Sequence, residues 1–540
     1  MRNSSKIDIE ANPFFALNIF KPQNRSLLFC FLFFFTVAVC GYLSVIILSV
    51  PYRDDWYRYL LNSHVGGFEA LRNGTALIEY LFYLSDTVTD ASPFTQVLSC
   101  ATLAYIACIF LLTFKVNLKN KWEILCFTPI VINPYLLEVM LYRFDNFFII
   151  LSLLIVSLSV YLSNMNKKDH FITQSLLLFL SLFVYQVAIS IYFTVFIYQF
   201  IKNIRSNVGF VETARKMKYW LYSLISVCIG YMPFLRFLDY HKTESGEVLA
   251  LPYNSENISV ILHNIYSYFQ TFYNDWSLNV IGLIMAIMFF VFILNTVIKT
   301  IQTTKSIYAT LFILLLLFIF LISPSGLYIG LKAFKEQKLL SPRLLCGIGV
   351  FIAIVNYEVY LLFCNTKITK ILTKIILCLI TTWTLMFFNT ATNILRENFK
   401  IRDLIEYDIT KDIFEVSNQY PQITHFSIIG KFKTPSCKTF FELYPIMNRI
   451  FSDELNIFTY HRLGFINDKL EESLTRDETI FFYEPKHFSK KLIKRHMMYD
   501  LYILNDYILQ IALKKAENPI KERYTIMKIF KKSENNKKLK

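Results

Sequence analysis

The chain is poor in glycine, with only 14 among its 540 residues. No glycine-rich loop that would cradle a phosphate occurs, and no Asp-x-Asp triplet is present. The zinc-protease pattern HExxH, the CxxC pair and a serine-centred elbow are missing as well. These absences disfavour a soluble nucleotide-sugar enzyme of the usual design, a hydrolase and a metalloprotease.

The ten cysteines show no spacing typical of a disulfide framework or a zinc site, because nine lie in apolar segments and Cys437 stands alone in a hydrophilic tail. Charged residues are also scarce, at 18%. By contrast 55% of residues are hydrophobic and the mean hydropathy is +0.42, whereas soluble domains average roughly 45 to 50% apolar residues. The composition predicts a bundle of membrane-spanning helices, and the net charge of +15 therefore does not indicate nucleic acid.

The first apolar run, residues 27–50, is too long for the core of a signal peptide, and no small-residue cleavage site follows it. We interpret it as an uncleaved first span. About eleven spans are predicted in all, at residues 27–50, 94–114, 123–139, 146–163, 171–185, 187–201, 219–239, 277–297, 306–324, 344–363 and 372–391.

Lysine and arginine clusters in alternate loops assign those loops to the cytoplasm under the positive-inside rule. The predicted outside segments are then 51–93, 138–145, 240–275, 323–343 and the tail. The loop 323–343 disagrees, because it carries Lys332, Lys335, Lys338 and Arg343, so a re-entrant element or a miscounted span is expected there.

The predicted domains are a cytoplasmic N-terminus (1–26), a transmembrane domain (27–391) and a periplasmic C-terminal domain (392–540). The last is charged and mixes strand-like stretches, 423–429 and 479–483, with a helical pattern at 406–419, which indicates a small α/β domain.

The strongest chemical signal is the acid pair Asp54 and Asp55, directly after the first predicted span. A carboxylate is able to take a proton from an attacking hydroxyl, and the flanking Arg53 and Arg58 are able to hold a phosphate by paired hydrogen bonds. The alternative is a solvated loop whose aromatic residues anchor it at the membrane interface.

A second signal is the group Glu138, Tyr142, Arg143 and Asp145, placed between two closely spaced apolar segments. Charge near membrane depth is costly and usually functional. The alternative is an ion pair that only closes a short hairpin. Weaker candidates, for which interfacial anchoring is the alternative, are Tyr185, Gln186, Arg236, Asp239, His241, Ser341 and Arg343.

Four stretches together resemble the GtrII family of bacterial O-antigen glucosyltransferases, which are serotype-converting enzymes of GT-C architecture. These stretches are PYRDDWYRY (51–59), NPYLLEVMLYRFDNF (133–147), LFVYQVAISIY (182–192) and SPRLLCGIG (341–349). The resemblance covers nearly the whole membrane part, and the tail shows no motif.

The resemblance implies an inner-membrane enzyme that takes a sugar, usually glucose, from undecaprenyl phosphate on the periplasmic side. The acceptor would be the lipid-linked O-antigen repeat, and the pathway partners a small flippase and a cytoplasmic-face glycosyltransferase. No cofactor is firmly implied, and the use of a divalent metal stays open.

The implied roles are a general base at Asp54 or Asp55 and donor-phosphate binding by Arg58, Arg143 and Arg53. Acceptor binding or orientation is implied for Glu138, Asp145, Tyr142 and Gln186. Competing interpretations are a lipid-linked oligosaccharide flippase or other transporter and an O-antigen polymerase.

Overall fold

The structure is a computed structural model, and it is mainly helical. It describes residues 25–48, 52, 55, 58, 73–85, 88–206, 208–240, 255–276, 280–330, 340–364, 366–423, 425–429, 442, 444–451, 475–476, 490–496, 499–504 and 508–513. The chain divides into two compact units. The helical unit comprises 1–50 and 62–389, and the tail unit comprises 51–61 and 390–540.

Among the described residues, seven helices are long and apolar enough to cross a membrane, judged by length and composition. They are α1 (Arg25–Leu48), α4 (Phe94–Thr113), α8 (Asn146–Met165), α10 (Ile189–Arg205, with the preceding 3-10 turn η4, Gln186–Ala188), α14 (Val280–Thr304), α15 (Ile307–Ile322, with the following η5, Ser323–Gly330) and α17 (Lys367–Gln419). Shorter or less apolar helices on predicted spans are α9 (Phe171–Val184), α12 (Lys218–Tyr240) and α16 (Ile348–Phe363). The predicted helical architecture is thus confirmed, and several of its helices could span a membrane, while the count of eleven spans stays a prediction.

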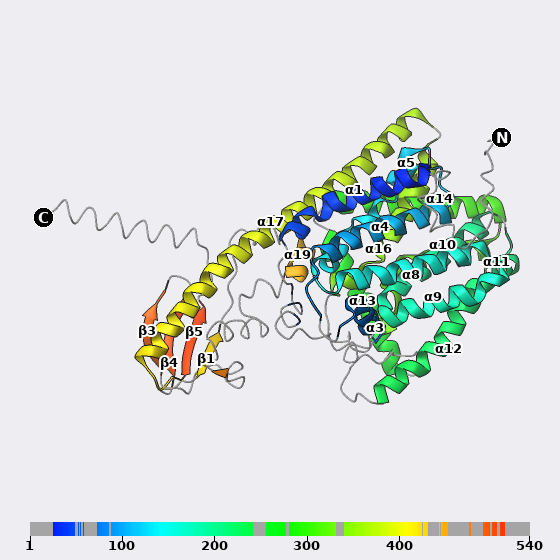
Figure 1. The fold of residues 1–540 in the computed structure, drawn as a ribbon. Coiled ribbons are helices and arrows are strands. Elements are labelled where there is room, and N and C mark those ends of the chain that lie inside the picture. The colour runs from blue at the N-terminus through cyan, green and yellow to red at the C-terminus, as the bar shows by residue number, and fades with distance from the viewer. Residues whose placement is uncertain are drawn as a thin grey trace. The chain divides into compact units, whose positions relative to one another are not determined.

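The helical unit has a central and a peripheral set of helices. In α4 and α8, 72% of the most apolar window is buried, whereas in α1 and α14 the share is only 28%. Figure 1 shows α4, α8 and α9 packed side by side. A helix that is apolar on all faces yet largely exposed fits lipid as its surroundings, so α1 and α14 have the surface of lipid-facing helices.

The span predicted at 123–139 is not one helix. It consists of α5 (Lys121–Leu125), α6 (Thr128–Val131) and α7 (Leu136–Leu141). Pro129 lies in α6, and Pro134 follows it, where a proline removes a helical hydrogen bond and clashes with the preceding turn. The segment still crosses the bundle, because it starts beyond the C-terminal end of α4 and returns to its N-terminal end, where the Thr95 hydroxyl donates to the Arg143 carbonyl oxygen at 3.0 Å. We call residues 121–145 the broken crossing segment.

The predicted outside loop 240–275 contains a long helix, α13 (Ser255–Trp276). Its buried residues recur every three or four positions, from Asn257 through Asn264 and Thr271 to Asp275, which is a helical stripe of mainly polar side chains. The apolar-run criterion missed it for that reason. The Asn264 side-chain amide donates to the Ile329 carbonyl oxygen at 3.0 Å, which joins α13 to η5.

In the segment 323–343, η5 packs against α10 and α13, and Gly326 has a positive φ of 57° beside Ser190. The lysines that made this segment ambiguous, Lys332, Lys335 and Lys338, lie outside the described residues. The remaining short elements of the helical unit are α3 (Asn73–Tyr83), η3 (Lys168–His170), α11 (Phe210–Lys216) and η7 (Pro342–Leu345).

The tail unit holds the predicted small sheet. Its five strands, in the order β2-β1-β5-β4-β3, are β1 (His425–Ile429), β2 (Thr475–Arg476), β3 (Lys490–Arg495), β4 (Tyr499–Leu504) and β5 (Ile508–Leu513). β1 is parallel to β2 and β5, and β3, β4 and β5 form an antiparallel meander. The predicted strand at 479–483 lies outside the described residues.

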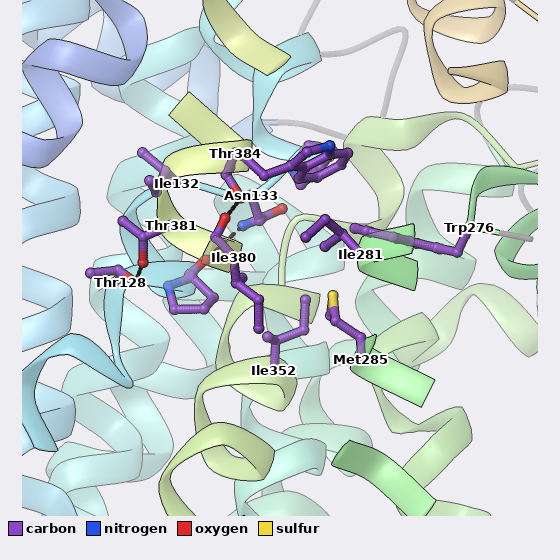
Figure 2. A pocket seen from close by; sticks show the side chains of 13 residues that line it. Thr128, Ile132, Asn133, Trp276, Ile281, Met285, Ile352, Ile380, Thr381 and Thr384 are labelled. Atoms are coloured by element: carbon purple, nitrogen blue, oxygen red, sulfur yellow. Dashed lines mark hydrogen bonds between the residues drawn. The ribbon is translucent and has the colours of Figure 1, made fainter. Parts of the chain in front are cut away.

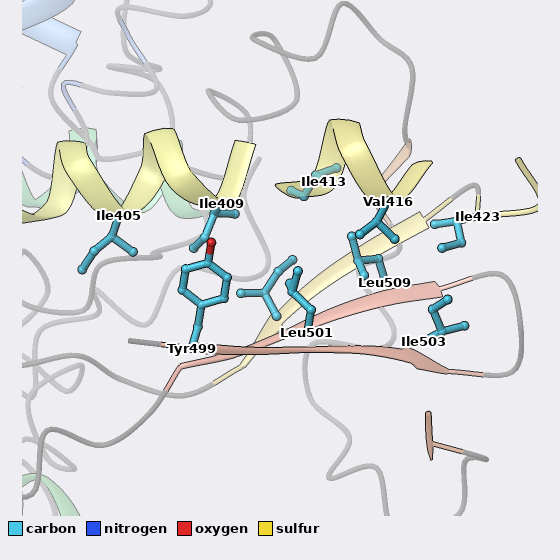
Figure 3. Packing of buried hydrophobic residues seen from close by; sticks show 10 residues of the cluster. Ile405, Ile409, Ile413, Val416, Ile423, Tyr499, Leu501, Ile503 and Leu509 are labelled. Carbon is cyan, nitrogen blue, oxygen red and sulfur yellow. The ribbon is translucent and has the colours of Figure 1, made fainter. Parts of the chain in front are cut away.

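One stripe of α17 covers this sheet. Ile405, Ile409 and Ile413 pack onto Leu501 and Leu509, as Figure 3 shows. On the same helix, the buried Asp412 carboxylate accepts from Lys494 Nζ at 2.5 Å and from the Tyr499 hydroxyl at 2.7 Å. The Asp412 hydrogen bond raises the pKa of Lys494 above its usual value. The tail unit therefore has an apolar core and a buried charged anchor of its own.

Candidate functional site

The Glu138 carboxylate, on α7, is fully buried and is held by the segment before α16. The Ser341 hydroxyl donates to both carboxylate oxygens, at 3.1 and 2.9 Å, and the Arg343 backbone N–H donates to Oε2 at 2.8 Å. A buried carboxylate is tolerated only where such donors replace water. The broken crossing segment and the loop before α16 are therefore fixed to each other at one end of the bundle.

Arg343 extends this network to Tyr142. Its guanidinium donates to the Tyr142 hydroxyl at 2.6 Å and lies 5.4 Å from the centre of the Tyr142 ring. The hydroxyl of Tyr185, the residue before η4, donates to the Arg343 carbonyl oxygen at 3.4 Å. Planar guanidinium groups held in this way recognise phosphate or carboxylate through paired N–H donors. The position of Arg343 thus suits an anionic ligand.

Arg143 has a partner that the sequence did not suggest. Its guanidinium forms a salt bridge with Asp90, in the loop before α4. Asp145 is the residue before the first turn of α8 and is largely buried. The Asn146 side chain accepts from the Ser99 hydroxyl at 2.7 Å, which fixes this corner to α4.

Tyr135 connects the broken crossing segment to α13. Its hydroxyl donates to the Asp275 carboxylate at 2.8 Å and accepts from the indole N–H of Trp276 at 2.9 Å. Asn133 shapes the turn before it, since its amide donates to the Pro129 carbonyl oxygen at 3.0 Å and its Oδ1 accepts from the Tyr135 N–H at 3.2 Å.

A small cavity of about 20 Å³ lies beside this turn, and Figure 2 shows Asn133 and Thr384 at its edge with Trp276 on the opposite side. A volume of that size has room for roughly one water molecule. Thr128 and Thr381 share a hydrogen bond of 3.2 Å nearby, which holds α6 to α17.

Trp276 also lines a much larger apolar groove of about 620 Å³ between α13, α14 and α16. Its walls are aromatic and aliphatic side chains, among them Tyr268, Phe272, Leu283 and Phe351. Leu283 and Tyr273 are 62% and 72% exposed, so the groove opens to the surroundings of the bundle. A groove of this composition fits a hydrocarbon chain.

The groove and the polar network meet on α13. Between the groove residues Tyr268 and Phe272, the Thr271 hydroxyl accepts a hydrogen bond of 3.0 Å from the Leu340 N–H, next to Ser341. One helix turn further, Asp275 and Trp276 contact Tyr135, three residues before Glu138. The groove residue Trp276 is therefore hydrogen-bonded to Tyr135, which also donates to the buried carboxylate of Asp275.

Of the first predicted pair, Asp54 and the neighbouring Arg53 lie outside the described residues. Asp55 and Arg58 belong to the tail unit, where each is 1% exposed. The Asp55 carboxylate accepts from the Tyr52 N–H at 3.2 Å, and the Tyr52 hydroxyl donates to the Ile450 carbonyl oxygen of α19 (Pro445–Phe451). The Tyr52 hydroxyl thus connects this segment to the rest of the tail unit, and Asp55 fixes the local turn.

Arg343 brings Glu138 and Tyr142 together, while Arg143 and Asp145 lie in the following turn. Gln186 is half-buried at the start of η4. For Arg236 and Asp239 only the backbone is described, within α12, and His241 lies outside the described residues. The roles of all these residues stay predictions.

Three residues of this region are not identified as site candidates from the sequence, namely Asp275, Trp276 and Asp90. Arg343 is only a weaker candidate there. The signal for Asp275 was present, because it continues the polar stripe of α13 at helical spacing. Arg343 can be identified only from its contacts. Its backbone N–H donates to Glu138, which lies 205 positions earlier in the sequence. Among the described residues, no group of three or more His, Cys, Asp or Glu side chains is arranged to hold a metal ion.

Comparisons with known proteins agree with these features. Residues 43–354 match the family described as Glucosyl transferase GtrII, and this range includes the broken crossing segment, most residues of the groove and the Glu138 network. An uncharacterized 55.3 kDa protein in the gtrB 5′ region of Salmonella phage P22 is 26% identical over 223 residues, or 38% of this chain. The match spans 43% of that phage protein. No solved structure matches the chain.

Proposed function

Because the chain belongs to the GtrII glucosyltransferase family, we propose that it moves glucose from undecaprenyl phosphate to a lipid-linked O-antigen repeat unit. The proposed location is the periplasmic face of the bacterial inner membrane, within a GT-C-type helical domain. The proposed outcome is O-antigen modification and serotype conversion. A small flippase and a cytoplasmic-face glycosyltransferase would supply the donor.

One observation supports a lipid-linked donor in particular. The apolar groove on α13, α14 and α16 is lined by Trp276, whose indole N–H donates to Tyr135 of the broken crossing segment, and Thr271 on the same helix accepts from the Leu340 N–H next to Ser341. A polyprenyl phosphate sugar has a long hydrocarbon chain joined to a charged phosphate, so it needs an apolar channel next to cations at the membrane interface. A nucleotide sugar has no such chain and would leave the groove without a use.

The proposed reaction is a direct displacement. The oxygen of an acceptor hydroxyl forms a bond to the anomeric carbon of glucose while its proton passes to the carboxylate of Asp54 or Asp55. The bond between the anomeric carbon and the phosphate oxygen breaks, and undecaprenyl phosphate leaves with the electron pair. Attack from the opposite side inverts the anomeric centre.

Arginines are proposed to hold the phosphate as its charge grows. Arg58, Arg143 and Arg53 take this role from the family resemblance, and the geometry adds Arg343. Glu138, Asp145, Tyr142 and Gln186 are proposed to bind or orient the acceptor. For Glu138 the contacts favour an orienting role, since both of its oxygens already accept from Ser341 and Arg343.

The test is a transfer assay with the full chain in liposomes that contain undecaprenyl-phosphate glucose and a lipid-linked O-antigen acceptor. Wild type should transfer glucose, and Asp54→Asn or Asp55→Asn should remove transfer without loss of folded protein. The matched control is Asp169→Asn, an exposed acid in η3, which should transfer normally.

Transfer that survives both single changes and the double change would refute the base assignment. Movement of the donor lipid between leaflets by wild type and mutants alike, with no glucose transfer, would refute the transferase and favour a flippase.

A further inference from the structure

A second groove lies on the helical unit, at the end of the bundle opposite to Glu138. It has a volume of about 400 Å³ and runs along the first turns of α17 against Trp122 of α5. Its floor is apolar, with Ile371, Ile375 and Leu379 at successive helix turns. Lys374, which is half-buried, also lines this groove.

The ammonium groups of two lysines lie close to the Trp122 ring. Lys374 Nζ lies 4.8 Å from the ring centre and Lys121 Nζ lies 5.7 Å from it. An aromatic face attracts an ammonium group, but two ammonium groups beside one ring repel each other. An anion near the ring would remove that repulsion.

The surroundings hold more positive charge than the local acids neutralise. Six lysines come from residues 115–121 and from the first turns of α17. These two segments meet here, because Asn120 Nδ2 donates to the Tyr360 hydroxyl, near the end of α16, at 3.3 Å. None of the six forms a salt bridge with another described residue; they are Lys115, Lys119, Lys121, Lys367, Lys370 and Lys374.

The two carboxylates nearest in these elements are already occupied. Glu123 is buried and accepts from the Asn117 N–H at 3.1 Å and from Asn120 Nδ2 at 2.9 Å. Glu358 pairs with Arg205 at 2.8 Å and accepts from the Tyr198 hydroxyl at 2.5 Å. The lysines therefore present their charge outward rather than to the protein.

We propose that this groove binds an anionic phospholipid of the surrounding leaflet. The headgroup phosphate lies between Lys121 and Lys374 at the edge of Trp122, and one acyl chain lies along Ile371, Ile375 and Leu379. Basic pockets between helices at a lysine-rich membrane face bind acidic headgroups in this way. The positive-inside rule assigns this end to the cytoplasmic leaflet, so the site is separate from the proposed reaction site.

The test measures lipid binding to the purified, delipidated full chain by native mass spectrometry. Phosphatidylglycerol and phosphatidylcholine with the same acyl chains are the two probes. Phosphatidylglycerol should bind at least several-fold more tightly. Equal binding of the two lipids would overturn the proposal, because the lysines would then contribute nothing.

The charge half of the site is tested by the double variant Lys121→Gln with Lys374→Gln. Each lysine near an anionic lipid contributes about five-fold in affinity, so phosphatidylglycerol binding should weaken by about thirty-fold. The matched control is Lys299→Gln with Lys305→Gln, two exposed lysines around the end of α14 that do not line the groove. An equal loss in the control would show general attraction to a basic surface and overturn the site.

The apolar half is tested by Leu379→Trp, which keeps every lysine and narrows the groove at a side chain that is already 50% exposed. Phosphatidylglycerol binding should fall several-fold while the thermal stability of the protein is retained. Unchanged binding would show that the acyl chain does not lie in the groove.

Discussion

The two ends of the helical unit differ in the exposure of their cations, although the lysine-rich end also holds one buried pair, Glu358 with Arg205. At one end Glu138, Arg143 and Arg343 are buried or half-buried, and each has a protein partner. At the other end, lysines such as Lys121 and Lys367 are exposed and form no salt bridge with a described residue. Charge that is desolvated and fixed in orientation is costly, and it is kept where geometry matters. Charge that stays exposed sets orientation in the membrane and attracts lipid headgroups.

The largest effect should come from removing the centre of the fixed network. Glu138→Ala leaves the Ser341 hydroxyl and the Arg343 N–H without their shared acceptor and releases the broken crossing segment from the loop before α16. A misplacement of about 1 Å at a reacting centre costs roughly 100-fold in rate, so glucose transfer should fall by about that factor. Transfer rates in liposomes check this, with Glu138→Gln expected to retain more activity. A wild-type rate in Glu138→Ala would contradict the role of the network.

The next effect concerns the packing that holds the broken crossing segment in place. Gly349 of α16 lies so close to α6 that an added Cβ would meet the Pro129 carbonyl oxygen and lie 2.8 Å from Asn133 Nδ2. Gly349→Ala should therefore lower the free energy of unfolding by about 1 to 3 kcal/mol, as overpacking does. Thermal unfolding in detergent measures it. Gly209→Ala is the control, since nothing lies within 4 Å of an added Cβ there, and equal stability of the two variants would refute the close packing.

A smaller loss is expected from Tyr142→Phe. The change keeps the ring under the Arg343 guanidinium but removes the hydroxyl that accepts its 2.6 Å hydrogen bond. A hydrogen bond to a charged group contributes about 1.5 to 3 kcal/mol, so transfer should fall by roughly ten-fold or more. Steady-state rates at several donor concentrations test whether donor binding weakens. An unaltered rate and KM would place Arg343 outside the donor site.

The smallest effect is expected at the lysine-rich end. Lys299→Gln removes one positive charge, as Arg343→Gln does, but from an exposed side chain. Substitutions of this kind usually change stability by less than about 0.5 kcal/mol, so transfer should stay within two-fold of wild type. Arg343→Gln, measured in the same assay, should lose at least ten-fold. Similar losses in both variants would remove the distinction between the two ends.

Much of this arrangement is predictable from the sequence. Long apolar runs gave α1, α4 and α8 to within two residues of their limits, because a helix in lipid must satisfy its own backbone hydrogen bonds over a fixed length. The same criterion failed for residues 123–139, where Pro129 and Pro134 interrupt an apolar run that is buried inside protein. It also failed for α13, whose buried stripe is polar.

The candidate site was predictable in part. The segment with Glu138 and Tyr142 stood out, because charged groups between apolar runs are rare. The partners of these residues were not predictable, since Ser341 contacts Glu138 and Arg343 contacts Tyr142 only through the tertiary fold. The sequence also does not distinguish an acid that fixes a turn from one that acts as a catalytic base. Asp55 accepts from the Tyr52 N–H and so fixes a turn, which the sequence alone does not show.

The apolar groove that Trp276 lines is proposed to receive the hydrocarbon chain of a polyprenyl phosphate sugar. The most direct test is photo-crosslinking of the full chain with a donor that carries a diazirine near the phosphate end of its isoprenoid chain. Labelled peptides should map to α13 and α14, around Tyr273 and Leu283. An excess of unlabelled donor should suppress the labelling. Labels confined to other helices, or unaffected by competing donor, would contradict this proposal.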